Sequence, residues 1–295
     1  MIVINSELLI VNWLSLPTML DIGKYNTLQI KRRTDNGFYL AETQVEEVLL
    51  PNKFITPQMK IGDTIKVFVY KDSEDRPVAT TQTPLAIVDE AVYLLVKEVT
   101  GIGAFLDWGL DKDLFLPFRE QAAPVEQGRY CLVYLYFDYA SKRVVATTNL
   151  NKFIKNRELT VKLGDEVDLL ITYENEIGIR VIINQKHWGI LYRNEIFNPI
   201  EKGSHVKGYI KKVREDGKLD VALQKQGIAG ANDAKDRTLL RIMENNGLLR
   251  LSDNSTPEQI YQALGISKKN FKKAVGMLFK EGKVELLDDG VKLIK

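Results

Sequence analysis

Apolar and polar residues alternate with a period of two along much of the chain. The segments 28–33, 65–70 and 206–213 alternate clearly, and 130–137 is rich in β-branched and aromatic residues. Both patterns are typical of short β-strands with one buried face. The first such region predicts five strands, near 28–33, 37–42, 47–51, 65–70 and 77–81.

Glycines recur through this strand-rich part at a constant spacing. Gly37, Gly103 and Gly178 are each followed by a leucine 13 residues later and by a second glycine 25 residues later. Each unit then closes on a Val-Ala pair, such as Val78-Ala79. A unit of roughly 65 residues that occurs three times indicates a small domain repeated in tandem.

Five short strands in about 60 residues favour a small barrel of the OB type, because closure removes the exposed edges of a small sheet. The predicted fold is therefore three all-β five-stranded OB barrels in tandem, followed by an α+β winged helix-turn-helix domain. The predicted boundaries are an N-terminal extension at 1–20, barrels at 21–84, 85–150 and 151–230, and the winged helix at 231–295.

The spacing of apolar residues becomes helical from Asn232 onward. A first helix is expected to end near Gly247, a second to begin at Ser255-Thr256-Pro257, and a third to run from Lys268 to Glu281. A hairpin with an Asp-Gly turn follows at 283–294. Three helices and a hairpin, with a tight turn between the second and third helices, are typical of a winged helix.

The third predicted helix has a basic face and an apolar face. Its apolar face is predicted to contain Phe271, Val275, Leu278 and Phe279. Lysines without Arg, Asn or Gln suit contact with phosphates rather than the reading of base edges. The alternative is a domain that serves only for packing or protein contact. The lysines of this helix are Lys268, Lys269, Lys272, Lys273 and Lys280.

The net charge of +2 is unevenly distributed along the chain. Residues 1–148 carry 15 Lys and Arg against 19 Asp and Glu, a net charge of −4; residues 149–295 carry 26 against 20, a net charge of +6. A basic C-terminal half indicates a polyanionic partner for that half. The alternative is an ordinary solvated surface.

Composition argues against several other classes of protein. The single cysteine, Cys131, cannot form an intrachain disulfide, which fits a reducing cytoplasm. One cysteine and two histidines are too few for a structural zinc site, so no metal or cofactor is expected. No paired-carboxylate, Ser/His or Cys/His set points to an enzyme. The apolar run 8–16 lacks a preceding Lys or Arg and is too short to span a membrane. It is either an element packed on the first barrel or an upstream extension with the natural start near Met19.

The second unit resembles the S1-type RNA-binding OB repeats, through the stretches Gly101-Ile-Gly-Ala-Phe-Leu-Asp-Trp-Gly109 and Asp113-Leu-Phe-Leu-Pro117. The resemblance implies a nucleic-acid face with three ligand positions in each unit. The aromatic position after the glycine falls on Tyr39, Phe105 and Arg180, the second on Pro51, Pro117 and Tyr192, and the basic one on Arg76, Lys142 and Lys218.

The third unit is predicted to bind RNA best. Proline does not stack as the family's histidine does, whereas Arg180 and Tyr192 both offer planar surfaces for unpaired bases. Tyr192 is expected to point outward if Leu191 points into the barrel. Nearby basic residues are Lys211, Lys212 and Lys218. Alternatively, Tyr39 and Phe105 are core residues, and Trp108 and Trp188 are expected to fill barrels or loops.

Three OB units followed by a winged helix resemble the conserved virulence factor B family of Gram-positive bacteria. The most specific stretches are 103–110, 117–121 and 267–276. The resemblance implies a non-catalytic cytoplasmic protein that binds single-stranded RNA and controls gene expression post-transcriptionally, as a virulence regulator. The alternative is a DNA-binding transcription regulator that acts through the winged helix. The oligomeric state is left open.

Overall fold

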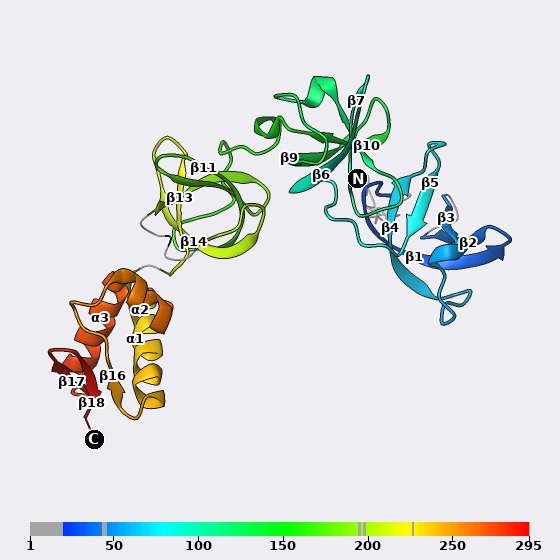
Figure 1. Cartoon of the computed structure of the whole chain (residues 1–295). Coiled ribbons are helices and arrows are strands. Elements are labelled where there is room, and N and C mark those ends of the chain that lie inside the picture. The colour runs from blue at the N-terminus through cyan, green and yellow to red at the C-terminus, as the bar shows by residue number, and fades with distance from the viewer. Residues whose placement is uncertain (1–19, 43–45, 194–195, 197–198, 226, 295) are drawn as a thin grey trace, which may run out of the picture. The chain divides into compact units, whose positions relative to one another are not determined.

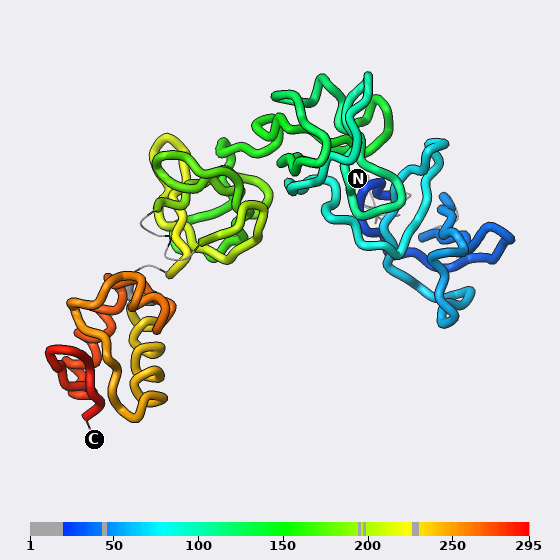
Figure 2. Tube along the Cα trace, viewed as in Figure 1, coloured from blue at the N-terminus to red at the C-terminus, as the bar shows by residue number. Residues whose placement is uncertain are grey.

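The computed structural model describes residues 20–42, 46–193, 196, 199–225 and 227–294 (Figures 1 and 2). This part of the chain divides into two compact units. The first unit comprises the described residues up to Glu90 together with Leu94–Thr148, and it holds two barrels. The second unit comprises Ala91–Tyr93 and the described residues from Asn149 onward, and it holds a third barrel and a helical domain. The predictions for the N-terminal extension fall on residues that, except for Leu20, lie outside the described ones.

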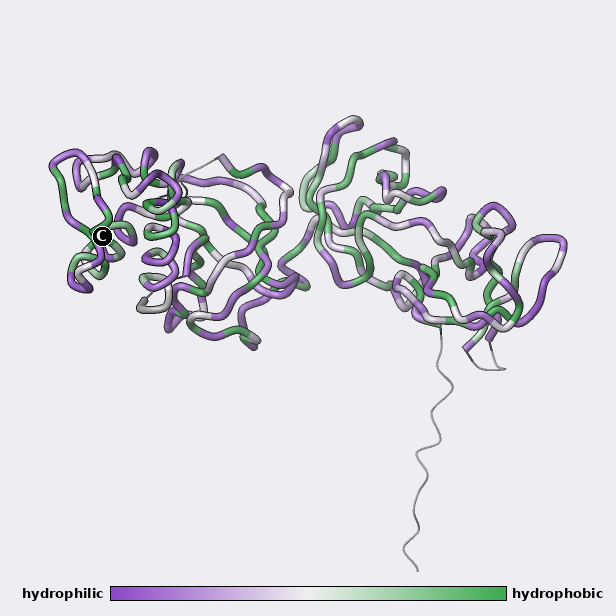
Figure 3. Tube along the Cα trace, turned by 90° about the horizontal axis from the view of Figure 1, so that it is seen from below, coloured by the Kyte–Doolittle hydropathy of each residue, from purple (hydrophilic) through white to green (hydrophobic). Residues whose placement is uncertain are grey.

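The first barrel is a closed five-stranded sheet, as predicted. Its strands are β1 (Lys24–Thr34), β2 (Gly37–Ala41), β3 (Val48–Pro51), β4 (Thr64–Lys71) and β5 (Pro77–Thr80), in the order β1-β2-β3-β5-β4. Alternating residues point into the barrel, and Figure 3 shows hydrophobic and hydrophilic residues interspersed along the strands. The core includes Leu28, Ile30, Leu40, Leu50 and Val67.

The second barrel has the same strand sequence but is only nearly closed. Its strands are β6 (Ala91–Thr100), β7 (Gly103–Leu106), β8 (Leu114–Pro117), β9 (Tyr130–Asp138) and β10 (Arg143–Thr147), in the order β10-β9-β6-β7-β8. Closure would need a ladder between β8 and β10. In the first barrel the equivalent parallel strands, β3 and β5, are paired at a single position, Leu49 with Val78. The contact between the third and fifth strands is therefore the weakest strand pairing in these two barrels.

The third barrel is closed. Its strands are β11 (Glu166–Glu174), β12 (Gly178–Ile183), β13 (His187–Tyr192), β14 (His205–Val213) and β15 (Leu219–Ala222), in the order β11-β12-β13-β15-β14. The parallel pair of β13 with β15 registers three residue pairs, from Gly189 with Leu219 to Leu191 with Val221. The fold predicted from the repeats is therefore confirmed for all three units.

The repeated glycines mark a close approach of two strands in every barrel. Gly37 pairs with Pro51, Gly103 with Pro117 and Gly178 with Tyr192. A Cβ atom on any of these glycines would lie well inside contact distance of the carbonyl oxygen of the leucine that precedes the partner. The spacing of 13 residues is therefore the length of the connection that brings glycine and leucine together.

We expect Gly103→Ala to destabilise the second barrel by roughly 3 kcal/mol, because strained backbone and overpacking add. Gly103 has a φ of 153°, and its added Cβ would lie 2.5 Å from the carbonyl oxygen of Leu116. Gly101→Ala is the matched control: it has open space around its Cβ, so its effect should stay within about 0.5 kcal/mol. Denaturant unfolding followed by circular dichroism measures both, and equal effects would contradict this account.

The C-terminal domain is a winged helix, as predicted. Its elements are α1 (Gly227–Glu244), β16 (Leu248–Leu249), α2 (Pro257–Leu264), α3 (Lys268–Lys280), β17 (Val284–Leu287) and β18 (Gly290–Leu293), with the sheet order β16-β18-β17. Thr256 caps α2 in a capping box, and Ser267 caps α3. Gly265, in the left-handed conformation, ends α2 and sets the tight turn.

Two details of the helices differ from the prediction. Helix α1 begins at Gly227, earlier than Asn232. Phe279 was expected on the apolar face of α3 but is 53% exposed. The buried stripe of α3 runs through Phe271, Val275 and Leu278, and Phe279 lies one residue further round the helix, at the edge of that stripe. Of the helices described, none is long and apolar enough to cross a membrane.

Trp108 joins the first barrel to the second. Its side chain is 3% exposed, its Nε1 donates to the carbonyl oxygen of Ala86 at 2.7 Å, and its ring lies edge-on to Phe68 of β4, with centroids 5.5 Å apart. Arg143 also forms an ion pair with Asp75 of the first barrel. Trp108 therefore fills a structural position between the two barrels, and it also lines a small cavity together with Phe105 and Phe115.

Candidate nucleic-acid interface

The outward face of the second and third strands carries the first two of the three predicted ligand positions in each barrel. In the third barrel Leu191 is fully buried and Tyr192 is half-buried on the opposite side of β13, so the predicted alternation is confirmed. Arg180 of β12 pairs in register with Ile190, which lies on the same outward face. Tyr39 and Phe105 occupy the equivalent half-buried positions of the first two barrels.

A cavity of about 360 Å³ lies on this face of the third barrel. It is lined by side chains from β12, from β13 and from the β14–β15 hairpin. The structure therefore brings together three of the predicted residues, Arg180, Tyr192 and Lys218, which are far apart in the sequence. Among the lining residues are Arg180, Trp188, Tyr192, Arg214 and Lys218.

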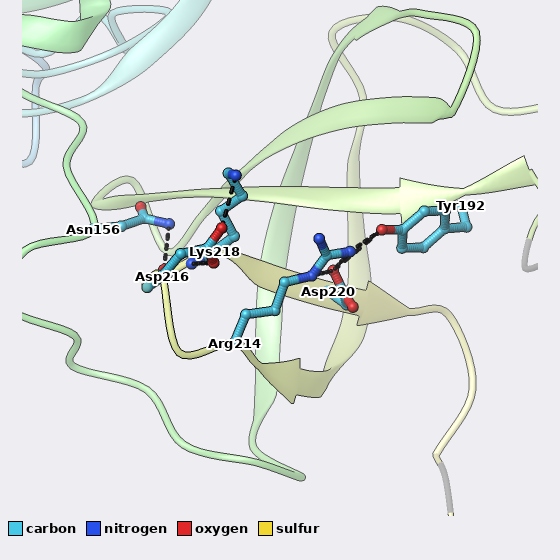
Figure 4. A network of polar contacts seen from close by, with 7 residues as sticks. Asn156, Tyr192, Arg214, Asp216, Lys218 and Asp220 are labelled. Atoms are coloured by element: carbon cyan, nitrogen blue, oxygen red, sulfur yellow. Dashed lines mark hydrogen bonds and ion pairs between the residues drawn. The ribbon is translucent and has the colours of Figure 1, made fainter.

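A polar network fixes Tyr192 at one wall of this cavity (Figure 4). Arg214 donates to the hydroxyl of Tyr192 and, through Nε, to Oδ1 of Asp220 at 2.9 Å. Asp220 is 8% exposed, and its hydrogen bond to Arg214 raises the pKa of that guanidinium. The buried carboxylate thus balances the charge of Arg214, and the network holds the Tyr192 ring in one orientation.

Lys218 lies on the hairpin between β14 and β15, at the mouth of the same cavity. Its Nζ forms an ion pair with Asp216 at 2.7 Å, in an exposed position where such a pair contributes little to stability. Asn156 donates from Nδ2 to the carbonyl oxygens of Trp188 and Gly217, at 2.8 and 3.0 Å. Asn156 therefore ties β13 to the hairpin that carries Lys218.

Trp188 lines the cavity, although it was expected to fill the barrel or a loop. Its ring is covered by Arg180, whose guanidinium carbon lies 3.7 Å from the ring centroid. Arg180 also donates to the hydroxyl of Tyr173. A signal in the sequence could have found Trp188: residues two apart on a strand share a face, so an outward Tyr192 places Ile190 and Trp188 outward as well.

The first barrel offers a less open surface at its equivalent positions. The guanidinium of Arg32 lies 3.8 Å above the ring of Tyr39, and Arg32 pairs with Glu47 at 2.6 Å. Arg76, the basic residue assigned to the last hairpin, pairs with Asp72 and Glu74. Both of these cations, Arg32 and Arg76, therefore have a carboxylate beside them.

In the second barrel Phe105 packs against Phe115, with ring centroids 5.2 Å apart. Both rings line a small cavity of about 130 Å³ that is shared with Tyr70 of the first barrel. Lys142 is exposed in the loop between β9 and β10, with a φ of 53°, and is not among the residues that line this cavity. The three assigned positions therefore converge less well here than in the third barrel.

Four of the remaining predicted lysines lie on α3, and two of them contact other side chains or backbone groups of the domain. Lys268 donates to the carbonyl oxygen of Ser255 at 2.8 Å, and Lys272 pairs with Asp253 at 3.0 Å. Lys269 and Lys273 are exposed on α3, and within the described residues neither forms an ion pair. The half-buried Lys211 and the exposed Lys212 lie on β14, outside the residues that line the cavity.

Gln224 connects the third barrel to the start of α3 in the winged helix. It follows β15, and its Oε1 accepts from the backbone N–H of Ser267 at 2.9 Å and from Asn270 at 3.3 Å. Its Nε2 donates to the carbonyl oxygen of Gly265 at 3.0 Å. One amide thus satisfies backbone groups at the start of α3 and in the turn before it.

Comparison with known proteins places this architecture. The S1 domain family matches residues 22–82 and 90–149, and the CvfB-like winged helix domain matches residues 236–293. The chain is 29% identical to the uncharacterized protein YitL of Bacillus subtilis, over 89% of this chain and 90% of YitL. It is 23% identical to conserved virulence factor B of Staphylococcus saprophyticus, over 91% and 95% of the two chains.

A crystal structure of a multidomain protein with nucleic acid binding domains from Streptococcus pneumoniae is also similar. It is 22% identical, with a TM-score of 0.38, and the match covers 92% of this chain and 98% of that chain. The chain combines S1 domains with a CvfB-like winged helix domain, and it is a homologue of the conserved virulence factor B proteins and of YitL.

Proposed function

We propose that this chain is a non-catalytic cytoplasmic protein that binds single-stranded RNA through its third barrel and winged helix, and so regulates gene expression post-transcriptionally. The observation that carries the proposal is the cavity on the third barrel, where Arg180, Trp188 and Tyr192 converge. Indole, phenol and guanidinium groups all stack on unpaired bases, whatever the sequence.

Charge supports the same assignment. The half of the chain that holds the third barrel and the winged helix has a net charge of +6, against −4 for the first half. Lys269 and Lys273 of α3 are exposed and suited to phosphate contact. S1 domains and winged helices are both classes of nucleic-acid-binding domain, which agrees with a binding role. The preference for a single strand over a duplex rests on the stacking surfaces, since stacking requires unpaired bases.

We expect the fragment 149–295 to retain most of the RNA affinity of the full chain, and the fragment 1–148 to bind weakly. The division follows the boundary between the two compact units. Fluorescence anisotropy with labelled homopolymer RNAs about 12 nucleotides long measures the dissociation constants, because an OB fold covers about 4–16 nucleotides. Circular dichroism of each fragment is the control for folding. Tighter binding by fragment 1–148 would contradict the assignment to the third barrel.

The second candidate function is duplex DNA binding through the winged helix, which the exposed lysines of α3 favour. The same anisotropy experiment with duplex DNA of equal length separates the two functions. The proposal requires RNA to compete effectively against the duplex. Tighter binding of the duplex, lost on the double replacement Lys269→Gln and Lys273→Gln, would instead support a DNA-binding regulator.

A further inference from the structure

Trp188 is held firmly by its backbone but not by its side chain. Its N–H donates to Oδ1 of Asn156 at 2.8 Å, and its carbonyl oxygen accepts from Nδ2 of the same residue at 2.8 Å. The indole Nε1, in contrast, is buried and has no hydrogen-bond partner among the residues that the structure describes. Buried donors are normally paired, so this one indicates a position completed by a ligand.

Arg180 covers the ring of Trp188 without a strong anchor of its own. Its guanidinium lies 3.7 Å from the indole centroid, and it donates to the hydroxyl of Tyr173 and, at 3.4 Å, to Asn151. Among the described residues no carboxylate pairs with Arg180, whereas Arg214 in the same cavity is paired with the buried Asp220. Neutral partners release a guanidinium more easily than a carboxylate does.

Building on the proposed function, we propose that Trp188 is the base-stacking site of the third barrel and that Arg180 occupies this site in the free protein. A flat guanidinium on the indole face takes the place that an unpaired base takes in the complex. On binding, Arg180 leaves the ring and contacts an adjacent phosphate, which provides the carboxylate-like partner that it lacks. The unpaired indole N–H then meets an acceptor oxygen of the ligand.

The experiment combines two signals from the full-length chain during titration with a labelled single-stranded homopolymer RNA. Anisotropy of the label reports binding, and tryptophan emission reports the ring environment. The chain has three tryptophans, so the difference between the original chain and Trp188→Phe isolates the emission of Trp188. In the absence of RNA, Arg180→Ala is expected to increase the quenching of Trp188 by acrylamide, because the guanidinium no longer covers the ring.

We expect RNA to quench the Trp188 component, and Trp188→Ala to weaken binding roughly 5- to 100-fold. Tyr130→Ala is the matched control: it removes an aromatic ring, 68% exposed, from the second barrel and should leave the affinity unchanged. Thermal unfolding checks that Trp188→Ala still folds. If Trp188→Ala does not fold, the change of Trp188 emission on adding RNA to the original chain and the acrylamide quenching of Trp188 in Arg180→Ala still test the proposal.

The outcomes separate this inference from the function on which it rests. RNA binding with unchanged Trp188 emission would overturn the inference, because a base would then stack on Arg180 rather than replace it. Unchanged affinity of a folded Trp188→Ala chain would overturn it too. No RNA binding by the original chain would instead contradict the proposed function.

Discussion

The affinity of this chain for single-stranded RNA is expected to fall roughly 50-fold when monovalent salt rises from about 50 to about 200 mM, if about four phosphates are contacted. The cations that we assign to these contacts are Arg180, Lys218, Lys269 and Lys273. The three lysines are exposed, and among the residues that the structure describes only Lys218 of these three pairs with a carboxylate, that of Asp216, which is itself exposed. Each contact releases counterions, so the logarithm of the affinity falls linearly with the logarithm of salt.

Charge variants test which cations contribute. The double replacement of Lys269 and Lys273 by Gln should lower the slope by about 1.4, since each contact to a single strand contributes about 0.7. Replacing Lys60 and Lys66 by Gln is the matched control, because it removes the same charge from exposed positions of the first barrel. An affinity that is insensitive to salt, or equal losses of slope in both variants, would contradict the assignment.

The replacement Trp108→Ala is expected to lower the free energy of unfolding of the first unit by about 3–5 kcal/mol. The indole fills the space between the first two barrels, makes an edge-on contact with Phe68 and satisfies the carbonyl oxygen of Ala86. Alanine would leave a cavity and an unpaired carbonyl group together. Denaturant unfolding followed by circular dichroism gives the change.

Trp108→Phe is the matched control for this prediction. It keeps an aromatic ring against Phe68 but loses the hydrogen bond to Ala86, so a smaller loss of about 1–3 kcal/mol is expected. RNA affinity should stay unchanged in both variants, because Trp108 belongs to the first unit. A large loss of RNA affinity in folded Trp108→Ala protein would place the binding site in the first two barrels instead.

The barrels could be predicted from the sequence because their constraints are local and repeated. Gly37, Gly103 and Gly178 each sit where a side chain would collide with the backbone of the neighbouring strand, so the same residue recurs at the same spacing. The winged helix could be predicted for a similar reason. Thr256 and Ser267 are capping residues within one turn of the helices that they start.

The site was predicted only in part, because its interactions join residues that are far apart in the chain. Alternation along β13 was sufficient to place Tyr192 on the outward face. It gave no indication that Asp220 is buried beside Arg214, or that Arg180 lies on Trp188. Those contacts depend on how β12, β13 and the β14–β15 hairpin come together in three dimensions. The contact of Trp108 could not be predicted for the same reason, since its partner Phe68 belongs to another barrel.

The hydrogen bonds of Gln224 couple two contacts of the proposed RNA complex, one at the third barrel and one at α3. Under the proposed function, an RNA strand bound at the third barrel is held on the same compact unit as the lysines of α3, because Gln224 joins the end of β15 to the start of that helix. The second contact then forms intramolecularly, at an effective concentration in the millimolar range that short tethers provide. The avidity of the pair can therefore exceed the affinity of either part by about 10²-fold or more.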